Sequence, residues 1–225
     1  MLVAVLALAM SASPSFTLWV WDAPNDLSFV PDDVTLAVFA GEVHIAADET
    51  WSMRRRAQKV RGLSGRAVTV VFRLTTGGRG IPEGSVGALA AALLDRMKAF
   101  DSLSLQIDFD AQPREYSDYR RLLVNLRART KAKLSITALA SWCREEWLHD
   151  LPVSQVVPQL FRLGRDAATW RARFETGDEL KGCGTSVGIS TDEFTKPIAA
   201  AREVFIFRPG TWTPEAFVQI QERWK

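Results

Sequence analysis

Histidine and cysteine are scarce in this sequence, and neither is spaced as a metal ligand. The 225 residues contain two histidines, His44 and His149, and two cysteines, Cys143 and Cys183. Metal sites built from these residue types need several of them at short spacings or brought together with carboxylates. The four lie far apart here, so the sequence predicts no metal site and no bound cofactor.

The two cysteines are expected to be thiols. The strand assignment given below places Cys143 after the end of one strand and Cys183 before the start of another, at opposite ends of a barrel. A disulfide needs Cα atoms within about 7 Å of each other. An even cysteine count in an exported protein would also fit a disulfide, but the expected positions favour two thiols.

No charge of one sign dominates. Lys plus Arg total 28 and Asp plus Glu total 26, a net charge of +2, which argues against nucleic acid as a partner. One exception is the stretch Trp51 to Arg66, which has six basic residues and no acidic one. Because no nucleic-acid motif accompanies it, we interpret it as a solvated hairpin and loop rather than a polyanion site.

Long apolar runs are also missing, which argues against an integral membrane segment. The first 13 residues, MLVAVLALAMSAS, form a short apolar run that ends in small residues, although no Lys or Arg precedes Arg54. We therefore expect a signal peptide over residues 1–15 and a single barrel domain over 16–225. The protein is then periplasmic or secreted, and otherwise cytoplasmic.

What the sequence does contain is a repeated strand pattern within a 47% hydrophobic composition. Most of these runs are apolar on both faces, as expected of parallel strands covered on two sides. We expect eight strands, over residues 17–22, 34–40, 67–74, 103–110, 134–140, 155–163, 185–190 and 203–209.

Helical patterns separate most of these strands. They cover residues 85–100, 116–130, 167–175, 195–203 and 213–224. Eight strands with helices between most of them predict an α/β fold, a (β/α)₈ TIM-like barrel. Between the second and third strands, residues 41–58 fit a β-hairpin better than a helix. The alternative is an open doubly wound sheet, but no strand is followed by a glycine-rich phosphate turn; residues 75–80, TTGGRG, lack its spacing.

Candidate functional residues follow from the fold, because chemistry in a (β/α)₈ barrel sits at the carboxyl ends of the strands. These positions hold Asp22, Arg73, Asp108, Asp110, Ser141, Trp142, Arg162, Ser190, Asp192, Glu193, Arg208 and Trp212. In the strand SLQIDFDAQP, alternation places Gln106, Asp108 and Asp110 on one face and Leu105, Ile107 and Phe109 on the other. Two carboxylates on a buried face need compensation, which Arg73 and Arg162 on nearby strands can supply.

Paired carboxylates point to acid–base chemistry. Residues i and i+2 of a strand lie about 6.6 Å apart, close to the separations of about 5–9.5 Å that glycosidases use. Crowded carboxylates also raise one pKa and so supply an acid beside a base. We predict Asp110, Asp108 and Asp22 as catalytic residues and Arg73, Arg162, Trp142 and Trp212 as substrate-binding residues; Trp21 could also stack on a sugar face.

Six blocks in order resemble a bacterial family catalogued as domain of unknown function 3142. They are WVWDAPNDLSF, LQIDFDA, YRRLLVNLR, LSITALASWC, VVPQLFRLG and GISTDE, between Trp19 and Trp212. This resemblance implies a barrel-like fold and no particular activity. IDFDAQ also resembles the Asp-x-Asp-x-Glu strand of family 18 glycoside hydrolases. Asp108 and Asp110 match its aspartates, whereas Gln112 stands at the position of the catalytic glutamate and has no proton to give.

We weigh three functions against these observations. The first is a glycoside-hydrolase-like barrel that acts on an envelope carbohydrate, with Asp110 as the acid or base nearest the mouth. The second is a barrel with a degenerate active site that binds a glycan or a protein without catalysis, which Gln112 favours. The third, a metal-dependent barrel enzyme, lacks support because no histidine joins the carboxylates. The predicted partner is thus a carbohydrate ligand.

Overall fold

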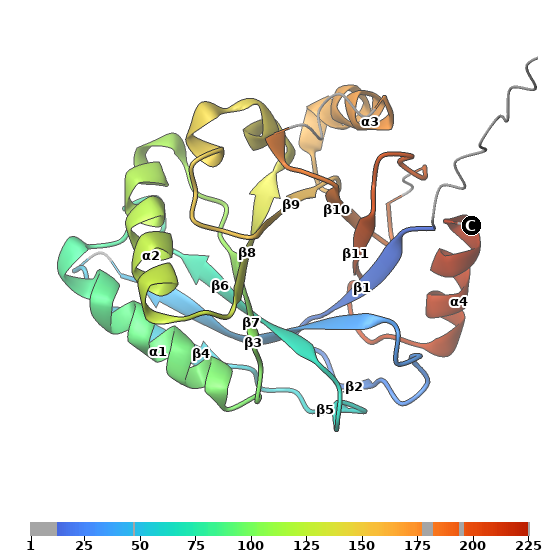
Figure 1. Ribbon diagram of the computed structural model, residues 1–225, viewed down its shortest axis with the longest axis horizontal. Coiled ribbons are helices and arrows are strands. Elements are labelled where there is room, and N and C mark those ends of the chain that lie inside the picture. The colour runs from blue at the N-terminus through green and yellow to red at the C-terminus, as the bar shows by residue number, and fades with distance from the viewer. Residues whose placement is uncertain (1–12, 47, 177–181, 194–195, 225) are drawn as a thin grey trace, which may run out of the picture.

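The computed structural model describes residues 13–46, 48–176, 182–193 and 196–224, and these fold around a closed barrel of parallel strands (Figure 1). Strand β1 pairs in parallel with both β11 and β3, which closes the ring. The predicted (β/α)₈ barrel is therefore confirmed. The ring consists, in spatial order, of β1 (Ser15–Val20), β3 (Thr35–Ile45), β6 (Val68–Thr75), β7 (Ser104–Asp108), β8 (Lys133–Leu139), β9 (Gln155–Gln159), β10 (Ser186–Ser190) and β11 (Glu203–Phe207).

Alternation along the strands separates two apolar layers. Leu105 and Ile107 of β7 belong to the large cluster between the strands and the helices. Gln106, between them, turns into the barrel, where it accepts a hydrogen bond from the indole of Trp19. Trp19 belongs to a smaller apolar cluster inside the barrel, together with Ala37, Val71, Val157, Phe161 and Phe205. The expected division of strand 103–110 into two faces is thus confirmed.

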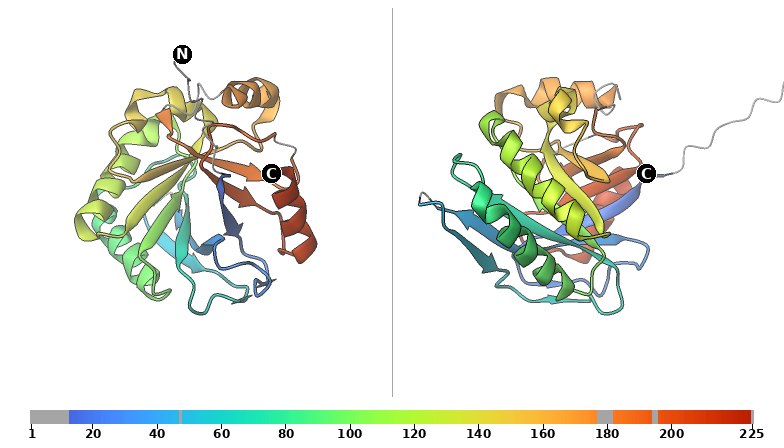
Figure 2. Two further views of the ribbon diagram at one scale, coloured as in Figure 1. Left: turned by 45° about the vertical axis from the view of Figure 1, so that its right-hand side comes forward. Right: turned by 60° about the vertical axis from the view of Figure 1, so that its left-hand side comes forward.

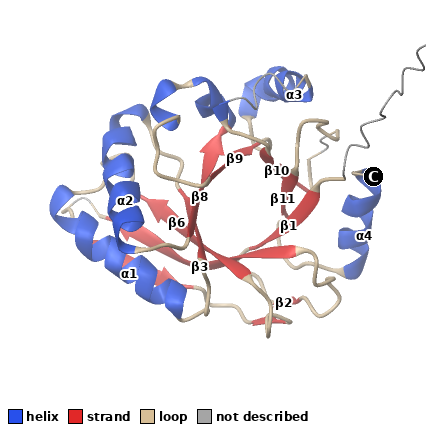
Figure 3. Ribbon diagram, viewed as in Figure 1, coloured by secondary structure: helices blue, strands red, loops and turns tan. Residues whose placement is uncertain are grey.

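Among the described residues, four α-helices lie on the outside of the ring (Figures 2 and 3). They are α1 (Val86–Lys98), α2 (Tyr116–Arg129), α3 (Ala167–Glu175) and α4 (Pro214–Arg223). Helix α2 buries Tyr119, Leu122, Leu123 and Leu126, a stripe at helical spacing that meets the barrel. Thr213 caps α4, because its hydroxyl accepts a hydrogen bond from the backbone N–H of Ala216 at 3.3 Å. Four of the five expected helices are therefore present within about two residues of their expected ends.

The fifth expected helix, 195–203, is wrong. Among its described residues, 196–202 form turns and irregular chain, and β11 begins at Glu203. Only residues 191–202 connect the end of β10 at the mouth of the barrel to the start of β11 at the opposite end. A helix rises about 1.5 Å per residue, so a helix here would leave few residues to turn at either end. The described residues of this connection instead bury Ile198 and Ala201 in the apolar core.

A β-hairpin takes the place of the helix between the second and third barrel strands, as predicted. Strand β4 (Trp51–Arg55) pairs antiparallel with the second half of β3, and His44 lies opposite Ser52 in this hairpin. A small parallel pair, β2 (Asn25–Asp26) with β5 (Val60–Arg61), lies beside it.

The basic stretch 51–66 is used within the fold. The Arg56 guanidinium donates to the backbone carbonyls of Val20 and Ala23 at 2.9 and 2.5 Å. Arg66 donates to the carbonyls of Val30 and Val34, both at 2.7 Å. These bonds satisfy carbonyl groups at the end of β1 and in the loop that follows it. The interpretation of this stretch as part of a hairpin and loop agrees with the structure.

The expectation of two thiols is wrong, because Cys143 and Cys183 form a disulfide with Cα atoms 5.0 Å apart. Cys143 lies in the 3-10 helix η3 (Ala140–Arg144), which follows β8, and Cys183 precedes β10. The expectation assumed that each cysteine stays at its strand end. However, η3 contacts β9 as well as β8, and the two cysteine segments meet so closely that a Cβ on Gly182 would lie 1.7 Å from the Cys143 carbonyl oxygen.

Two expectations concern the ends of the chain and its surroundings. Residues 1–12 of the expected signal peptide lie outside the described residues, so the structure does not bear on it. Within the part that the structure describes, none of the helices has the length and apolar character needed to cross a membrane.

Candidate functional site

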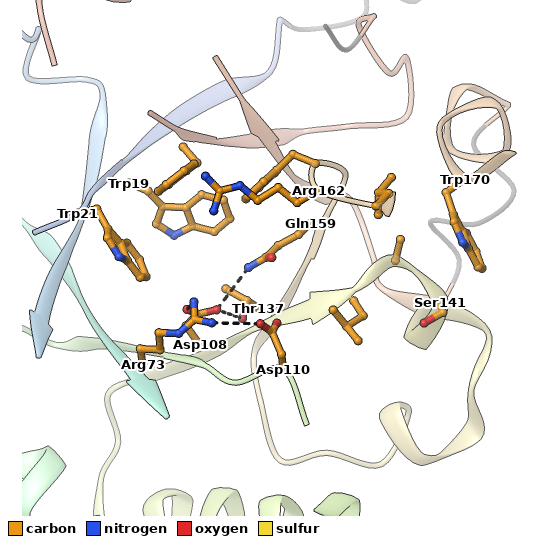
Figure 4. A pocket seen from close by; sticks show the side chains of 15 residues that line it. Trp19, Trp21, Arg73, Asp108, Asp110, Thr137, Ser141, Gln159, Arg162 and Trp170 are labelled. Atoms are coloured by element: carbon orange, nitrogen blue, oxygen red, sulfur yellow. Dashed lines mark hydrogen bonds and ion pairs between the residues drawn. The ribbon is translucent and has the colours of Figure 1, made fainter. Parts of the chain in front are cut away.

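A cavity of about 450 Å³ opens at the carboxyl ends of the barrel strands (Figure 4). Strands β1, β6, β7, β8, β9 and β11 and the loops that follow them contribute to its wall. The lining residues are Trp19, Trp21, Arg73, Asp108, Asp110, Thr137, Leu139, Ala140, Ser141, Gln159, Phe161, Arg162, Leu163, Trp170 and Phe207. Four of the seven predicted site residues, Arg73, Asp108, Asp110 and Arg162, are therefore brought together here.

Asp108 is the buried centre of the polar part of this cavity. It is the last residue of β7, and its side chain is 3% exposed. Its Oδ2 lies 3.1 Å from Arg73 Nη1, and its Oδ1 accepts hydrogen bonds from Thr137 Oγ1 at 2.7 Å and Gln159 Nε2 at 3.3 Å. These partners come from β6, β8 and β9, so the strand order of the barrel assembles the network.

The pKa of Asp108 lies above its ordinary value. Burial is the largest cause, because a carboxylate loses its hydration inside the protein. The Arg73 guanidinium lowers this pKa, the nearby Asp110 carboxylate raises it, and the hydrogen bonds from Thr137 and Gln159 lower it. Crowding by Asp110 thus acts in the expected direction but is secondary to burial.

Asp110 lies two residues further, in the loop after β7, and is the accessible carboxylate of the pair. Its side chain is 47% exposed, and its Oδ2 lies 3.3 Å from Arg73 Nη2. One guanidinium therefore holds both carboxylates by its two terminal nitrogens (Figure 4). The expected compensation by Arg73 is confirmed, whereas Arg162 forms no ion pair with either aspartate among the described residues.

Aromatic rings form the remaining walls. Trp19 is buried at the base of the cavity, where its indole N–H donates to Gln106 Oε1 at 2.7 Å. Trp21 packs on Phe39, with ring centroids 4.9 Å apart, and remains partly exposed. Phe161 and Phe207 stack in parallel 5.5 Å apart. Trp170 reaches the far side of the cavity from α3 (Figure 4).

Asp22, predicted as a third carboxylate, does not line the cavity. It accepts hydrogen bonds from the backbone N–H groups of Ala57 and Gln58, both at 3.1 Å, and pairs with Arg54 at 2.9 Å. Burial raises the pKa of Asp22, but the bonds from Arg54, Gln58 and Ala57 together lower it below its usual value. In the structure this carboxylate anchors the chain that follows the hairpin.

Trp142 and Trp212 also lie outside the cavity. Trp142 is buried in η3 and contacts the rings of Tyr116 and Trp147. Trp212 is buried beneath the barrel mouth, where its indole N–H donates to the Trp19 carbonyl oxygen at 2.9 Å. Both therefore support the elements that build the site.

The other strand-end candidates are distributed differently. Ser141 lines the cavity. The hydroxyl of Ser190 donates to Asp192, and Arg208 donates to the carbonyl oxygen of Thr211 at 2.7 Å. Glu193 accepts a hydrogen bond from the backbone N–H of Arg162 at 2.8 Å and so supports the cavity wall from outside.

Gln112, at the position of the catalytic glutamate of family 18, is not among the described residues that line the cavity. It is exposed, and its amide nitrogen would lie 3.3 Å from a Cβ on Gly78, in the loop after β6. Its backbone N–H donates to Glu115 Oε2 at 2.8 Å at the start of the 3-10 helix η2 (Pro113–Glu115).

Sequence reasoning missed several lining residues. Thr137 and Gln159 occupy inward positions, and the alternation of their strands could have revealed them. β9 was expected to continue to residue 163 but ends at Gln159. Gln159 was therefore not recognised as the strand-end residue that lines the cavity. Trp170 lies on a helix and carries no strand-end signal. In the part of the chain that the structure describes, no three His, Cys, Asp or Glu side chains gather as a metal site.

Comparison with solved structures finds two proteins whose names describe enzymes that act on glycans. The structure of an endo-beta-N-acetylglucosaminidase from Cordyceps militaris matches with a TM-score of 0.53 and 13% identity, over 87% of this chain and 81% of that one. The chitinase domain of the spore coat protein CotE from Clostridium difficile matches with a TM-score of 0.45 and 10% identity, over 70% of this chain. This chain spans only 53% of the CotE structure. At such identities the likeness shows the barrel fold alone.

A scan against protein-family models finds no match, and no curated protein matches the sequence.

Proposed function

We propose that the cavity binds a carbohydrate of the bacterial envelope and hydrolyses a glycosidic bond in it. One observation carries this proposal: a single guanidinium, that of Arg73, holds two carboxylates at the mouth of a barrel beside aromatic walls. Glycosidases generally use a pair of carboxyl groups beside the scissile bond. The name of the Cordyceps militaris neighbour, an endo-beta-N-acetylglucosaminidase, supports carbohydrate as the ligand class.

The two carboxylates have different roles in this proposal. Asp108 has both oxygens engaged and is nearly inaccessible, so it cannot reach a substrate directly. It holds Arg73, which in turn orients Asp110. Asp110 is accessible and gives or takes the proton at the glycosidic oxygen or at the attacking water. Trp21 and Trp170 offer their faces to the sugar rings.

A second function, binding without catalysis, is favoured by the position of Gln112. The described residues that line the cavity include no glutamate, and both oxygens of Asp108 are engaged. A binder needs only Arg73, Asp110 and the aromatic walls, all of which are present.

Membership of the bacterial family of domain of unknown function 3142 belongs to the proposal too, and it rests on the six sequence blocks. So does export to the periplasm or the medium. The Cys143–Cys183 disulfide supports export, because such bonds persist in oxidising compartments. If the apolar N-terminal segment is cleaved, protein from its native host should begin near residues 13–16. N-terminal sequencing that finds Met1 retained in a cytoplasmic fraction would contradict the proposed export.

The test of the enzyme is a hydrolase screen with Asp110→Asn as the variant. The substitution keeps the size of the side chain and removes its proton, so turnover should fall about 100-fold or more while saccharide binding persists. Asp95→Asn is the matched control, because Asp95 also forms an ion pair, with Lys98 at 2.9 Å on α1, away from the cavity.

The outcomes separate the two functions. Turnover that survives in Asp110→Asn would remove Asp110 as the acid or base. Saccharide binding by a wild-type protein that hydrolyses nothing in the screen would establish the binder instead.

A further inference from the structure

Among the described residues that line the cavity, Arg162 is a cation that the cavity carboxylates do not neutralise. Both aspartates are held by Arg73. The Arg162 guanidinium lies on the opposite side of the cavity (Figure 4), and among the described residues it makes no ion pair. The side chain is exposed to the cavity and to solvent. The Arg162 guanidinium is therefore available to a ligand that carries a negative charge.

The backbone holds Arg162 in an unusual conformation. Its φ is 55°, in the left-handed region that residues with a Cβ rarely adopt. Its N–H donates to Glu193 Oε1 at 2.8 Å, and the other oxygen of Glu193 pairs with Arg171 of α3. The Glu193 carboxylate is thus engaged by a backbone group and a different arginine, and it fixes the position of Arg162 without neutralising its side chain. Residues in such strained conformations cluster at ligand sites.

The guanidinium itself is held in place by an aromatic ring. Its Cζ lies 5.4 Å from the centroid of Phe207, which stacks on Phe161. Contact with the ring face orients the planar guanidinium and leaves its N–H edge available. That edge matches the two oxygens of a carboxylate in a bidentate arrangement.

We infer that Arg162 forms a cationic subsite in the cavity, which binds the carboxylate of an acidic sugar such as a hexuronic acid. A single guanidinium balances the single charge of a carboxylate, whereas a phosphate monoester would keep part of its charge uncompensated. Arg73 then serves the reacting bond and Arg162 selects the acidic ring. This inference rests on the proposed function, because it names the substrate class of the same cavity.

The test is calorimetric binding of three tetrasaccharide probes to the full chain: a hexuronic acid oligomer, its methyl ester and the neutral hexose oligomer. We expect the wild-type protein to bind the acid about 10- to 100-fold more tightly than the ester, as a charge-assisted bond implies. Arg162→Gln should abolish this preference, because it weakens binding of the acid far more than binding of the neutral oligomer. Arg162→Lys should restore part of it, because the charge returns without the planar fork.

Two controls keep the result specific. Arg162→Gln and Arg162→Lys both retain a Cβ, so the cost of the left-handed backbone is the same in both. Arg165→Gln removes an exposed arginine three residues away that does not line the cavity, and it should leave the preference intact.

Several outcomes would overturn the inference. They are equal affinity for acid and ester, a preference that persists in Arg162→Gln, binding of none of the acidic probes, and tighter Arg162-dependent binding of a sugar phosphate than of the acid. The proposed hydrolase is tested separately. An Arg162-dependent preference for the acid without turnover would support the cationic subsite and contradict the proposed hydrolase. Turnover of the neutral probe that is unchanged in Arg162→Gln, without any preference for the acid, would support the hydrolase and contradict the cationic subsite.

Discussion

Arg73 and Asp108 face each other across neighbouring strands, as partners in the register of β6 and β7, and their side chains meet at 3.1 Å. The ion pair is therefore a direct product of strand pairing. Because residues two apart on a strand share a face, the same register also fixes which side chains of each strand enter the barrel. A slip of one residue would turn Asp108 towards the helices and destroy the site.

Replacing Arg73 should destabilise the protein. Arg73→Gln leaves the buried Asp108 carboxylate without its cation, a loss of about 3–5 kcal/mol for fully buried pairs. The Arg73 side chain is 42% exposed, so we expect about 2 kcal/mol. Urea unfolding at pH 7 measures this loss. Arg165→Gln, at an exposed position, is the control, and an Arg73→Gln protein as stable as wild type would contradict the assigned network.

The raised pKa of Asp108 predicts how stability depends on pH. The folded protein holds the Asp108 proton more tightly than the unfolded chain, whose carboxyl titrates near its ordinary value of 3.8. The proton-linked contribution of Asp108 is therefore complete below that value and is lost as pH rises through the folded pKa. Wild type should lose stability relative to Asp108→Asn over this interval. Unfolding at a series of pH values tests this. The free energy of unfolding of wild type minus that of Asp108→Asn should fall as pH rises, and a value that stays constant or rises would contradict the prediction.

Asp22 should behave as a structural residue. Asp22→Asn weakens the bonds to Arg54, Ala57 and Gln58, so we expect a loss of about 1–2 kcal/mol in the free energy of unfolding. Saccharide binding and any turnover should remain at the wild-type level. A thermal melt and the hydrolase screen, run beside Asp110→Asn, separate the two aspartates. Turnover lost in Asp22→Asn at unchanged stability would return Asp22 to the catalytic group.

Removing the disulfide should lower the stability of the protein. The two cysteines are 40 residues apart, and closing a loop of that size stabilises the folded state by about 4 kcal/mol in the chain-entropy account. The double variant Cys143→Ser/Cys183→Ser should unfold at correspondingly lower urea. Reductant should lower the stability of wild type and leave the double variant unchanged. Equal stability of the two proteins under oxidising conditions would contradict the bond.

The sequence was sufficient to predict the barrel and the polar centre of the site, because both depend on local patterns. Alternation along β7 predicts the inward face of Asp108, and parallel strands bring Arg73 to the same mouth. Asp22 was misplaced because β1 ends at Val20, which leaves Asp22 in a loop whose path is set by distant hydrogen bonds to the hairpin. Cys143 and Cys183 meet through the course of two connections that no strand pattern encodes.

The disulfide has a further consequence for motion within the barrel. The chain that it closes into a ring includes β9, the Phe161–Arg162 wall and helix α3. Proteins open locally in cooperative units, and in this molecule a unit containing β9 cannot separate fully from its neighbours while the bond is intact. Amide hydrogens of β9 should therefore exchange with solvent slowly in the oxidised protein, and reduction would loosen one wall of the cavity while the Arg73 side stays in place.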